Sequence, residues 1–426
     1  MAEIRAFKGL RFNTDKAGTI DKLCCPPYDI ISEDQRRAFL QTNEHNIIRL
    51  ELPKEGANPY ATAKEVLDNW KNDGILMFED KPALYIYEEE FTAYGKRNSI
   101  KGLIARVKVE EFSKGIILPH EFTLSKAKED RLNLMKATNC NFSQIYALYM
   151  DSVHHTQALL EANSQTEPVM EYTDDDNVTH RMWIVTDEAV INDICKDFDD
   201  RKLFIADGHH RYETALNYRN YCRDNGISKE GDAQDYQMIF LMDMGHSGLV
   251  VFPTHRIIRD LQEFDGDSVL QKCKQYFDIT QIDDVNKCEG ELAKLYDNGE
   301  KAFGFYFDSK CYILKFNCKD KLAEIFPDIS AELAELDVTI LHTLILERLM
   351  GIDKENMANQ INLTYTKKFE EAISSVDNKS AQATFILNPT RVTQIRDVAA
   401  NGEKMPQKST YFYPKMITGM VMNELI

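Results

Sequence analysis

The chain has 426 residues and a formal net charge of −18, and 43% of its residues are hydrophobic. This length predicts two or three domains, and the composition is that of a globular protein rather than a disordered or fibrous one. The negative charge argues against partners such as nucleic acid or anionic membranes, and the absence of a signal peptide or an apolar run of about 18 residues predicts a cytoplasmic protein.

Strands and helices mix along the first half of the chain without a regular βαβ repeat. The double proline in CCPPYDIIS (24–32) excludes a regular helix there. The spacing of apolar residues over 62–76 predicts a helix, and residues 83–91 and 101–112 read as two strands of a hairpin that turns near 94–98. A long polar stretch (118–143) precedes a predicted strand, QIYALYM.

The second half continues the mixture. We expect strands in HRMWIVTD, KLFIADG, YQMIFLMDM and GLVVFPTHRII, a helix that ends at Gly226, a hairpin that turns near Asp308 and Ser309, and helix over 330–351. The pattern predicts an α+β fold with a mixed sheet. It also suggests four regions: an N-terminal region (1–115), a core (116–260), a small module (261–330) and a C-terminal helical region with a docked tail (331–426).

The segment FIADGHHRYETAL (204–216) is the strongest local signal. A strand ends at Asp207 and Gly208, and a helix follows, so backbone N–H groups at the helix start can bind phosphate together with His209, His210 and Arg211. The alternative is an ordinary helix cap, in which Asp207 accepts backbone N–H groups, the histidines face water and Arg211 pairs with an acid. Both interpretations stay open on spacing alone.

A second signal is the locally basic segment LPHEFTLSKAKEDRLNLMKATNCNFSQIY (118–146). Its cations suit a polyphosphate, although an amphipathic helix with solvated lysines explains them equally well. A glutamate at this position is suited to accept a hydroxyl proton. The segment contributes several candidate residues: His120, Glu121, Thr123, Lys126, Lys128, Arg131, Lys136, Asn141 and Ser143.

Other motifs are weaker or absent. The segments PTHRII (253–258) and KSTYFYPK (408–415) combine cations with hydroxyl or aromatic side chains. MGHSGL (244–249) lacks the spacing of a G-x-S-x-G nucleophile elbow, and the chain has no GxxxxGK[ST], GxGxxG or HExxH motif. Nine cysteines without a CxxC pair predict reduced, structural thiols.

Six ordered blocks resemble a known family. CCPPYDIIS, PHEFTLSKAKEDRLNLMKATNCNFSQIYALY, FIADGHHRYETAL, FPTHRII, LDVTILHTLILERLMGI and MPQKSTYFYPK are similar to the signature blocks of a bacterial and archaeal domain-of-unknown-function family, number 1015. The resemblance covers nearly the whole chain. It implies family membership but no activity.

The ADGHHR block is also similar to the phosphate-binding motif of the ParB and sulfiredoxin-like superfamily, which includes kinases of free serine. This resemblance implies a ParB/sulfiredoxin-like nucleotide-binding core with added terminal parts and a site in which Asp207, His209 and Glu121 are catalytic. Asp207 would also bind Mg²⁺. Gly208, His210, Arg211, Lys126 and Arg131 would bind ATP or ADP, and His120, Thr123, Asn141 and Ser143 would bind the acceptor.

The resulting hypothesis is a small-molecule kinase that transfers phosphate from ATP or ADP to a free hydroxyl amino acid, most plausibly L-serine, to give O-phosphoserine. Phosphoryl transfer requires mainly positioning and neutralisation of phosphate charge, which these residue types provide. The alternative is a nucleotide-sensing regulatory protein without a small-molecule acceptor. A homodimer is compatible with either hypothesis.

Overall fold

The computed structural model describes residues 1–123 and 125–426, and of residues 125–127 it describes the backbone alone. The chain forms two compact units. Unit 1 contains residues 1–119, 123–250 and 414–426, and unit 2 contains residues 120–122 and 251–413. The C-terminal tail thus returns to unit 1, while the three residues of the HEF segment belong to unit 2.

Unit 1 is built on a mixed sheet of nine of the described strands, in the order β6-β11-β8-β12-β5-β4-β10-β9, with β1 paired to β5. The pairs β6–β11 and β8–β12 are parallel and the others antiparallel. The strands are β1 (Ile4–Arg5), β4 (Leu84–Ala93), β5 (Lys96–Lys108), β6 (Ile117–Leu118), β8 (Ile145–Tyr149), β9 (Met170–Thr173), β10 (Thr179–Val185), β11 (Leu203–Asp207) and β12 (Tyr236–Asp243).

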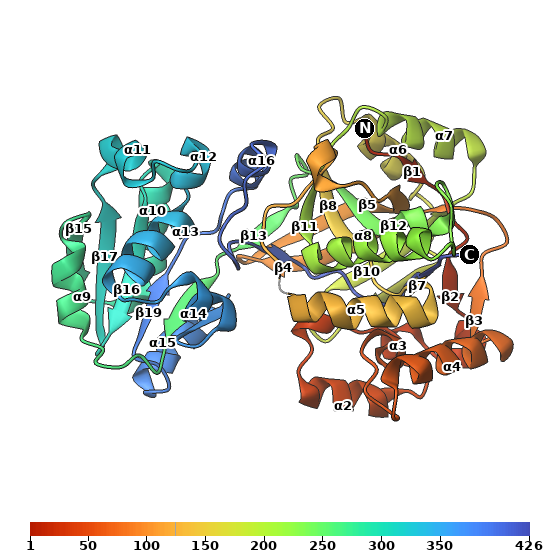
Figure 1. Ribbon diagram of the computed structural model, residues 1–426, viewed down its shortest axis with the longest axis horizontal. Coiled ribbons are helices and arrows are strands. Elements are labelled where there is room, and N and C mark those ends of the chain that lie inside the picture. Colours follow the sequence, from red (N-terminus) through yellow and green to blue (C-terminus); the bar gives the residue numbers. More distant parts are fainter. Residues whose placement is uncertain (124) are drawn as a thin grey trace. The chain divides into compact units, whose positions relative to one another are not determined.

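Helices cover this sheet because its central strands are apolar on both faces. Every residue of β8 and β12 is buried. Helix α8 packs on β8 and β12 of the sheet, α5 lies beside α8 (Figure 1), and α4 packs on α5. The helices of unit 1 are α1 (Thr14–Ala17), α2 (Glu33–Thr42), α3 (Ile48–Glu51), α4 (Pro59–Asn72), α5 (Ser125–Thr138), α6 (His155–Ala162), α7 (Glu188–Asp197) and α8 (His209–Asp224).

The main core of unit 1 lies between one face of the sheet and helices α6, α7 and α8. Alternate residues of β4 and β5, such as Ile86 and Leu103, meet Leu160 of α6, Ile194 of α7 and Tyr212 of α8. Burial of such side chains is the main stabilising contribution, about 1.5–3 kcal/mol for each large apolar residue. This packing fixes the ends of the strands, where the polar residues described below lie.

Unit 2 contains an antiparallel sheet of six described strands in the order β15-β17-β16-β19-β14-β18. The strands are β14 (His255–Ile258), β15 (Phe277–Ile282), β16 (Ala302–Phe307), β17 (Lys310–Phe316), β18 (Leu363–Thr366) and β19 (Ala383–Ile386). The helices are α9 (Gly266–Cys273), α10 (Cys288–Asp297), α11 (Leu322–Ile325), α12 (Ala331–Ala334), α13 (Asp337–Ile340), η7 (Leu341–Leu349), α14 (Lys354–Asn359), α15 (Phe369–Asp377) and α16 (Val392–Ala400).

Short pairings and single helical turns complete the fold. The paired strands are β2 (Leu10–Phe12) with β3 (Leu76–Phe78), β7 (Cys140–Asn141) with β21 (Asn423–Glu424), and β13 (Val250–Phe252) with β20 (Tyr411–Tyr413). The turns are η1 (Ile20–Lys22), η2 (Tyr28–Ile30), η3 (Phe112–Lys114), η4 (Ala233–Asp235), η5 (Val285–Lys287) and η6 (Lys319–Lys321).

The mixed α and β character and the mixed sheet are confirmed. So are both predicted hairpins, one turning at Tyr94 and Gly95 and the other at Asp308 and Ser309. The helix predicted over 330–351 is interrupted, because α12 ends before Asp337 and the stretch from Leu341 to Leu349 has the wider π-helical winding. The ParB-like core and the four predicted regions stay predictions.

Two further expectations concern the environment of the chain. Among the described residues, all nine cysteines are free thiols. Within the part of the chain that the structure describes, none of the helices has the length and apolar character needed to cross a bilayer.

Candidate functional site

The predicted phosphate motif lies at the end of β11 and the start of α8. Gly208 is the N-cap residue of this 16-residue helix and has a φ of 88°, a conformation that glycine adopts without strain. The helix-cap interpretation of Asp207 is therefore wrong in its main point, because the cap position belongs to the glycine. His209 is buried rather than solvated, and only the expected pairing of Arg211 with an acid is found.

The Asp207 carboxylate lies between two cations. Its Oδ1 accepts a hydrogen bond from Nζ of Lys415 at 3.2 Å, and its Oδ2 accepts one from Nη2 of Arg211 at 3.4 Å. Burial by itself would raise the pKa of Asp207, but the charges of Lys415 and Arg211 outweigh burial and hold the pKa well below its usual range. Asp207 is therefore ionised at neutral pH, and the cluster of three carries an excess positive charge.

Arg211 connects the Asp207 carboxylate to β8, the strand next to β11 in the sheet. Its side chain is buried, and its Nη1 donates a hydrogen bond to the backbone oxygen of Gln144, next to β8. The charges of Asp207 and Asp29 raise the pKa of Arg211 against the lowering effect of burial. The guanidinium is thus a fixed positive charge at the helix N-terminus, which itself favours anions.

A second group of polar residues surrounds Arg131 of α5. The Arg131 guanidinium donates to the backbone oxygen of Glu51 at 2.5 Å, pairs with Asp130 and lies 4.3 Å from the ring centre of Tyr28. Glu51 is only 2% exposed, and Ser143 donates a hydrogen bond of 2.9 Å to its Oε1. Burial raises the pKa of Glu51, and Arg131 and Arg211 oppose this effect.

A small cavity connects the two groups. It has a volume of about 40 Å³ and is lined by Glu51, Arg131, Asn141, Ser143, Arg211 and Thr214 among others. The side-chain nitrogen of Asn141 is buried there without a hydrogen-bond partner among the described residues. The lining also includes the apolar side chains Leu134, Met135 and Phe142, and a cavity of this volume has room for a few water molecules and is too small for a nucleotide.

The structure places the other predicted residues as follows. Thr123 donates to Glu213, which also accepts from Lys128, so these three form a polar network in unit 1. Lys136 lies 4.0 Å from the ring centre of Tyr221, so Lys128 and Lys136 are not simply solvated. The side chain of Lys126 lies outside the described residues. His210 occupies the first turn of α8, half-buried.

His120 and Glu121 belong to unit 2, unlike the Asp207 cluster. The ring of His120 is completely buried, and its Nε2 lies 3.0 Å from the Thr410 hydroxyl. The Glu121 carboxylate accepts hydrogen bonds from the backbone N–H of Ser409 at 3.2 Å and from Thr410 at 3.4 Å. The PHE and KSTYFYPK segments are thus joined, and the role of Glu121 as a base stays a prediction.

The PTHRII segment also connects to this part of unit 2. Arg256 is completely buried, donates from Nε to His342 at 3.1 Å and from Nη2 to the backbone oxygen of Lys408 at 3.1 Å, and also binds the backbone oxygen of Thr254. Burial lowers the pKa of Arg256 to about 10. These bonds tie three of the recognised blocks together, which gives Arg256 a structural role.

Three residues of the Asp207 and Arg131 clusters were missed as site residues in the sequence. Lys415 stands in the KSTYFYPK block, but nothing in the sequence shows that it meets Asp207. Glu51 could have been found from the sequence, because an acid inside the apolar run IIRLEL is expected to be buried. Tyr28 lies in the double-proline block.

Comparison with protein families gives a clear result. Residues 4–339 match the family described as "Protein of unknown function (DUF1015)". The chain belongs to this family. The expected family membership is therefore confirmed, over a range that contains the first four of the six blocks, and no curated protein matches the sequence.

Solved structures show only distant similarity. A conserved hypothetical protein from Pyrococcus furiosus matches with 14% identity and a TM-score of 0.36, covering 76% of this chain and 95% of that one. A free serine kinase in complex with AMP matches with 12% identity and a TM-score of 0.38, covering 76% and 93%. SbnI from Staphylococcus aureus, truncated at its C-terminus, matches with 10% identity and a TM-score of 0.35, covering 75% and 86%. Similarity at this level carries no argument here.

Proposed function

We propose that this member of the family is a nucleotide-dependent kinase that phosphorylates a free hydroxyl amino acid, L-serine first among them. The observation that carries the proposal is the arrangement around Asp207, where Lys415 and Arg211 flank one carboxylate at the N-terminus of a 16-residue helix. Two cations and a helix N-terminus provide the charge neutralisation that the phosphates of a nucleotide require. The resemblance of the ADGHHR segment to the phosphate-binding motif of the ParB and sulfiredoxin-like superfamily gives further support.

In the proposed reaction, the terminal phosphorus–oxygen bond of ATP or ADP breaks and a bond forms from that phosphorus to the serine hydroxyl oxygen. The products are O-phosphoserine and the nucleotide shortened by one phosphate. The serine proton passes to a carboxylate that acts as a general base. Backbone N–H groups of His209 and His210, with Arg211 and Lys415, would hold the transferred phosphate.

Mg²⁺ fits this site only as a partner of the nucleotide. Among the described residues, no group of three or more His, Cys, Asp or Glu side chains is arranged to bind a metal. Mg²⁺ commonly takes one or two carboxylates and completes its shell with phosphate and water, so Asp207 alone is sufficient. A bound Mg²⁺ would neutralise charge on the phosphates, and Asp207 would exchange part of its contact with Lys415 and Arg211 for the metal.

The test is a direct assay of the full-length protein. Purified protein is incubated with L-serine, Mg²⁺ and either ATP or ADP, and O-phosphoserine is measured by mass spectrometry across pH 6 to 9. The proposal expects product with one of the two donors. Absence of product with both donors overturns it, and nucleotide hydrolysis without phosphorylation of the acceptor would instead favour the nucleotide-sensing alternative.

A further inference from the structure

A second polar site lies on the sheet of unit 1, at the opposite end of β8 from Asp207. Asp207 pairs with Tyr146 near the start of β8, whereas Asp243, the last residue of β12, pairs with Tyr149 at its end. Beyond Asp243, a cleft of about 360 Å³ opens over β4, β5 and α6. Its volume is within the range of small-molecule sites, unlike the 40 Å³ cavity beside Arg211.

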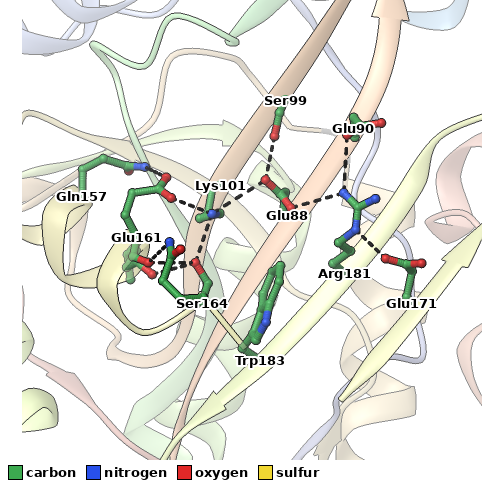
Figure 2. A network of polar contacts seen from close by, with 12 residues as sticks. Glu88, Glu90, Ser99, Lys101, Gln157, Glu161, Ser164, Glu171, Arg181 and Trp183 are labelled. Atoms are coloured by element: carbon green, nitrogen blue, oxygen red, sulfur yellow. Dashed lines mark hydrogen bonds and ion pairs between the residues drawn. The ribbon is translucent and has the colours of Figure 1, made fainter. Parts of the chain in front are cut away.

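Lys101 is the buried cation of this cleft and is only 8% exposed. Figure 2 shows its ammonium group between Glu161 on one side and Glu88 on the other. Nζ lies 2.8 Å from Glu161 Oε2 and 3.0 Å from Ser164 Oγ, but 3.8 Å from Glu88 Oε1, which is too long for a hydrogen bond. An ammonium has three donors, so one N–H of Lys101 has no hydrogen-bond acceptor among the described residues, while the ammonium also forms an ion pair with Glu88 and lies 5.5 Å from the ring centre of Trp183.

The loop MGHSGL supplies a second donor. A Cβ on Gly248 would lie 1.8 Å from the backbone oxygen of Ser99, so only glycine allows this loop to pack on β5. Nδ1 of His246 accepts a hydrogen bond from the Gly248 N–H at 3.1 Å, and burial lowers the pKa of His246. The ring is therefore neutral at pH 7 and carries its proton on Nε2, as a donor in a side chain that lines the cleft.

The lining is balanced in charge. Glu88 and Glu161 carry two negative charges and Arg97 and Lys101 two positive charges, so the formal sum is zero with His246 neutral. A ligand with a net charge is attracted by one pair and repelled by the other. A molecule with separated opposite charges interacts favourably with both.

We propose that this cleft binds a small zwitterion of the α-amino acid class. The carboxylate of the bound amino acid accepts hydrogen bonds from the third N–H of Lys101 and from the Nε2–H of His246. The ammonium group of the amino acid lies toward Glu88 and Glu161. This site is separate from the Asp207 cluster, and the proposal does not depend on kinase activity.

Binding is tested on the full-length protein by thermal shift and calorimetry, with each proteinogenic amino acid that lacks a side-chain hydroxyl. Such amino acids have no hydroxyl from which the proposed reaction could form a phosphate ester, so their binding does not depend on turnover in that reaction. For the tightest ligand, the amide, which is a cation, and the N-acetyl form, which is an anion, are each expected to bind at least about tenfold more weakly. No binding by any of these amino acids, or binding of the amide or the N-acetyl form as tight as that of the amino acid itself, overturns the proposal.

Variants locate the site. His246→Ala and Lys101→Met are each expected to weaken binding about tenfold or more, whereas His45→Ala, which alters a histidine outside the cleft, and Asp207→Asn leave it unchanged. His246 is the primary test, because loss of the buried Lys101 charge also affects folding. If His246→Ala leaves the affinity for the amino acid unchanged, or if only Asp207→Asn lowers that affinity, the amino acid binds outside this cleft and the proposal is overturned.

Discussion

The two polar sites of unit 1 have opposite charge arrangements on one sheet. At one end of β8, the carboxylate of Asp207 lies between the cations Lys415 and Arg211. At the other end, the cation Lys101 lies between the carboxylates Glu161 and Glu88. The first cluster keeps an excess positive charge at a helix N-terminus, while the second belongs to a lining whose charges cancel.

This difference indicates which ligands each site favours. An excess positive charge at a helix N-terminus favours a polyanion such as a nucleotide phosphate. A balanced lining around a cleft favours a ligand without net charge that still offers both an acceptor and a cation. Substitutions in the Asp207 cluster test this contrast.

Asp207→Asn is expected to reduce kinase turnover by a factor of roughly 100 or more, because an amide neither binds Mg²⁺ as a carboxylate does nor balances the two cations. The measurement is O-phosphoserine formation at saturating nucleotide, with circular dichroism to confirm folding. Asp200→Asn, at an exposed position, is the matched control. Full activity in a folded Asp207→Asn protein would remove this residue from the mechanism.

Lys415→Gln is expected to weaken nucleotide binding about tenfold, because it removes one of the two cations that flank Asp207. Calorimetric titration with ADP measures the change in Kd, and Lys202→Gln, an exposed lysine of the same unit, is the control. Added salt should weaken nucleotide binding to the wild type more than binding to Lys415→Gln. An unchanged Kd would show that the tail does not contribute to the phosphate site.

Gly208→Ala is expected to cost about 1–3 kcal/mol of unfolding free energy, because alanine is strained at a φ of 88° and its Cβ would lie 3.0 Å from Arg211 Nε. Gly226→Ala is the matched control, since Gly226 also has positive φ but no neighbouring atom within 4 Å of the added Cβ. Urea unfolding of both variants separates backbone strain from displacement of Arg211. Equal losses of unfolding free energy in the two variants would show that the contact of the added Cβ with Arg211 does not contribute to the destabilisation.

The contribution of Asp207 to stability is expected to depend on pH. Its pKa is lower in the folded protein than in the unfolded chain, so its ion pairs stabilise the fold fully above the unfolded value of about 3.9 and lose this effect as the pH falls through the folded pKa. The difference in unfolding free energy between the wild type and Asp207→Asn should therefore narrow below about pH 4. Urea unfolding at a series of pH values measures it, and a gap that widens on acidification would contradict the ion-pair description.

Much of the local structure could be predicted because it depends on near neighbours in the chain. The hairpins followed from alternating apolar residues and short polar turns, and α8 followed from its glycine and apolar spacing. The interrupted helix around Asp337 was not predicted, since both parts have helical spacing and the break depends on packing. The Asp207 motif was identified from the order of Asp207, Gly208, His209, His210 and Arg211, but the choice of Gly208 as the cap required the backbone geometry.

The α and β character, the family and the strand–glycine–helix junction at 203–216 could be predicted from the sequence, because these depend on composition and on residues that follow one another. Which charges meet depends on the tertiary structure. Lys415 reaches Asp207 across 208 positions, and Lys101 reaches Glu161 across 60. A lone lysine or glutamate in the sequence reads as a solvated side chain, and its role appears only when the sheet brings a distant partner to it and burial strengthens their interaction.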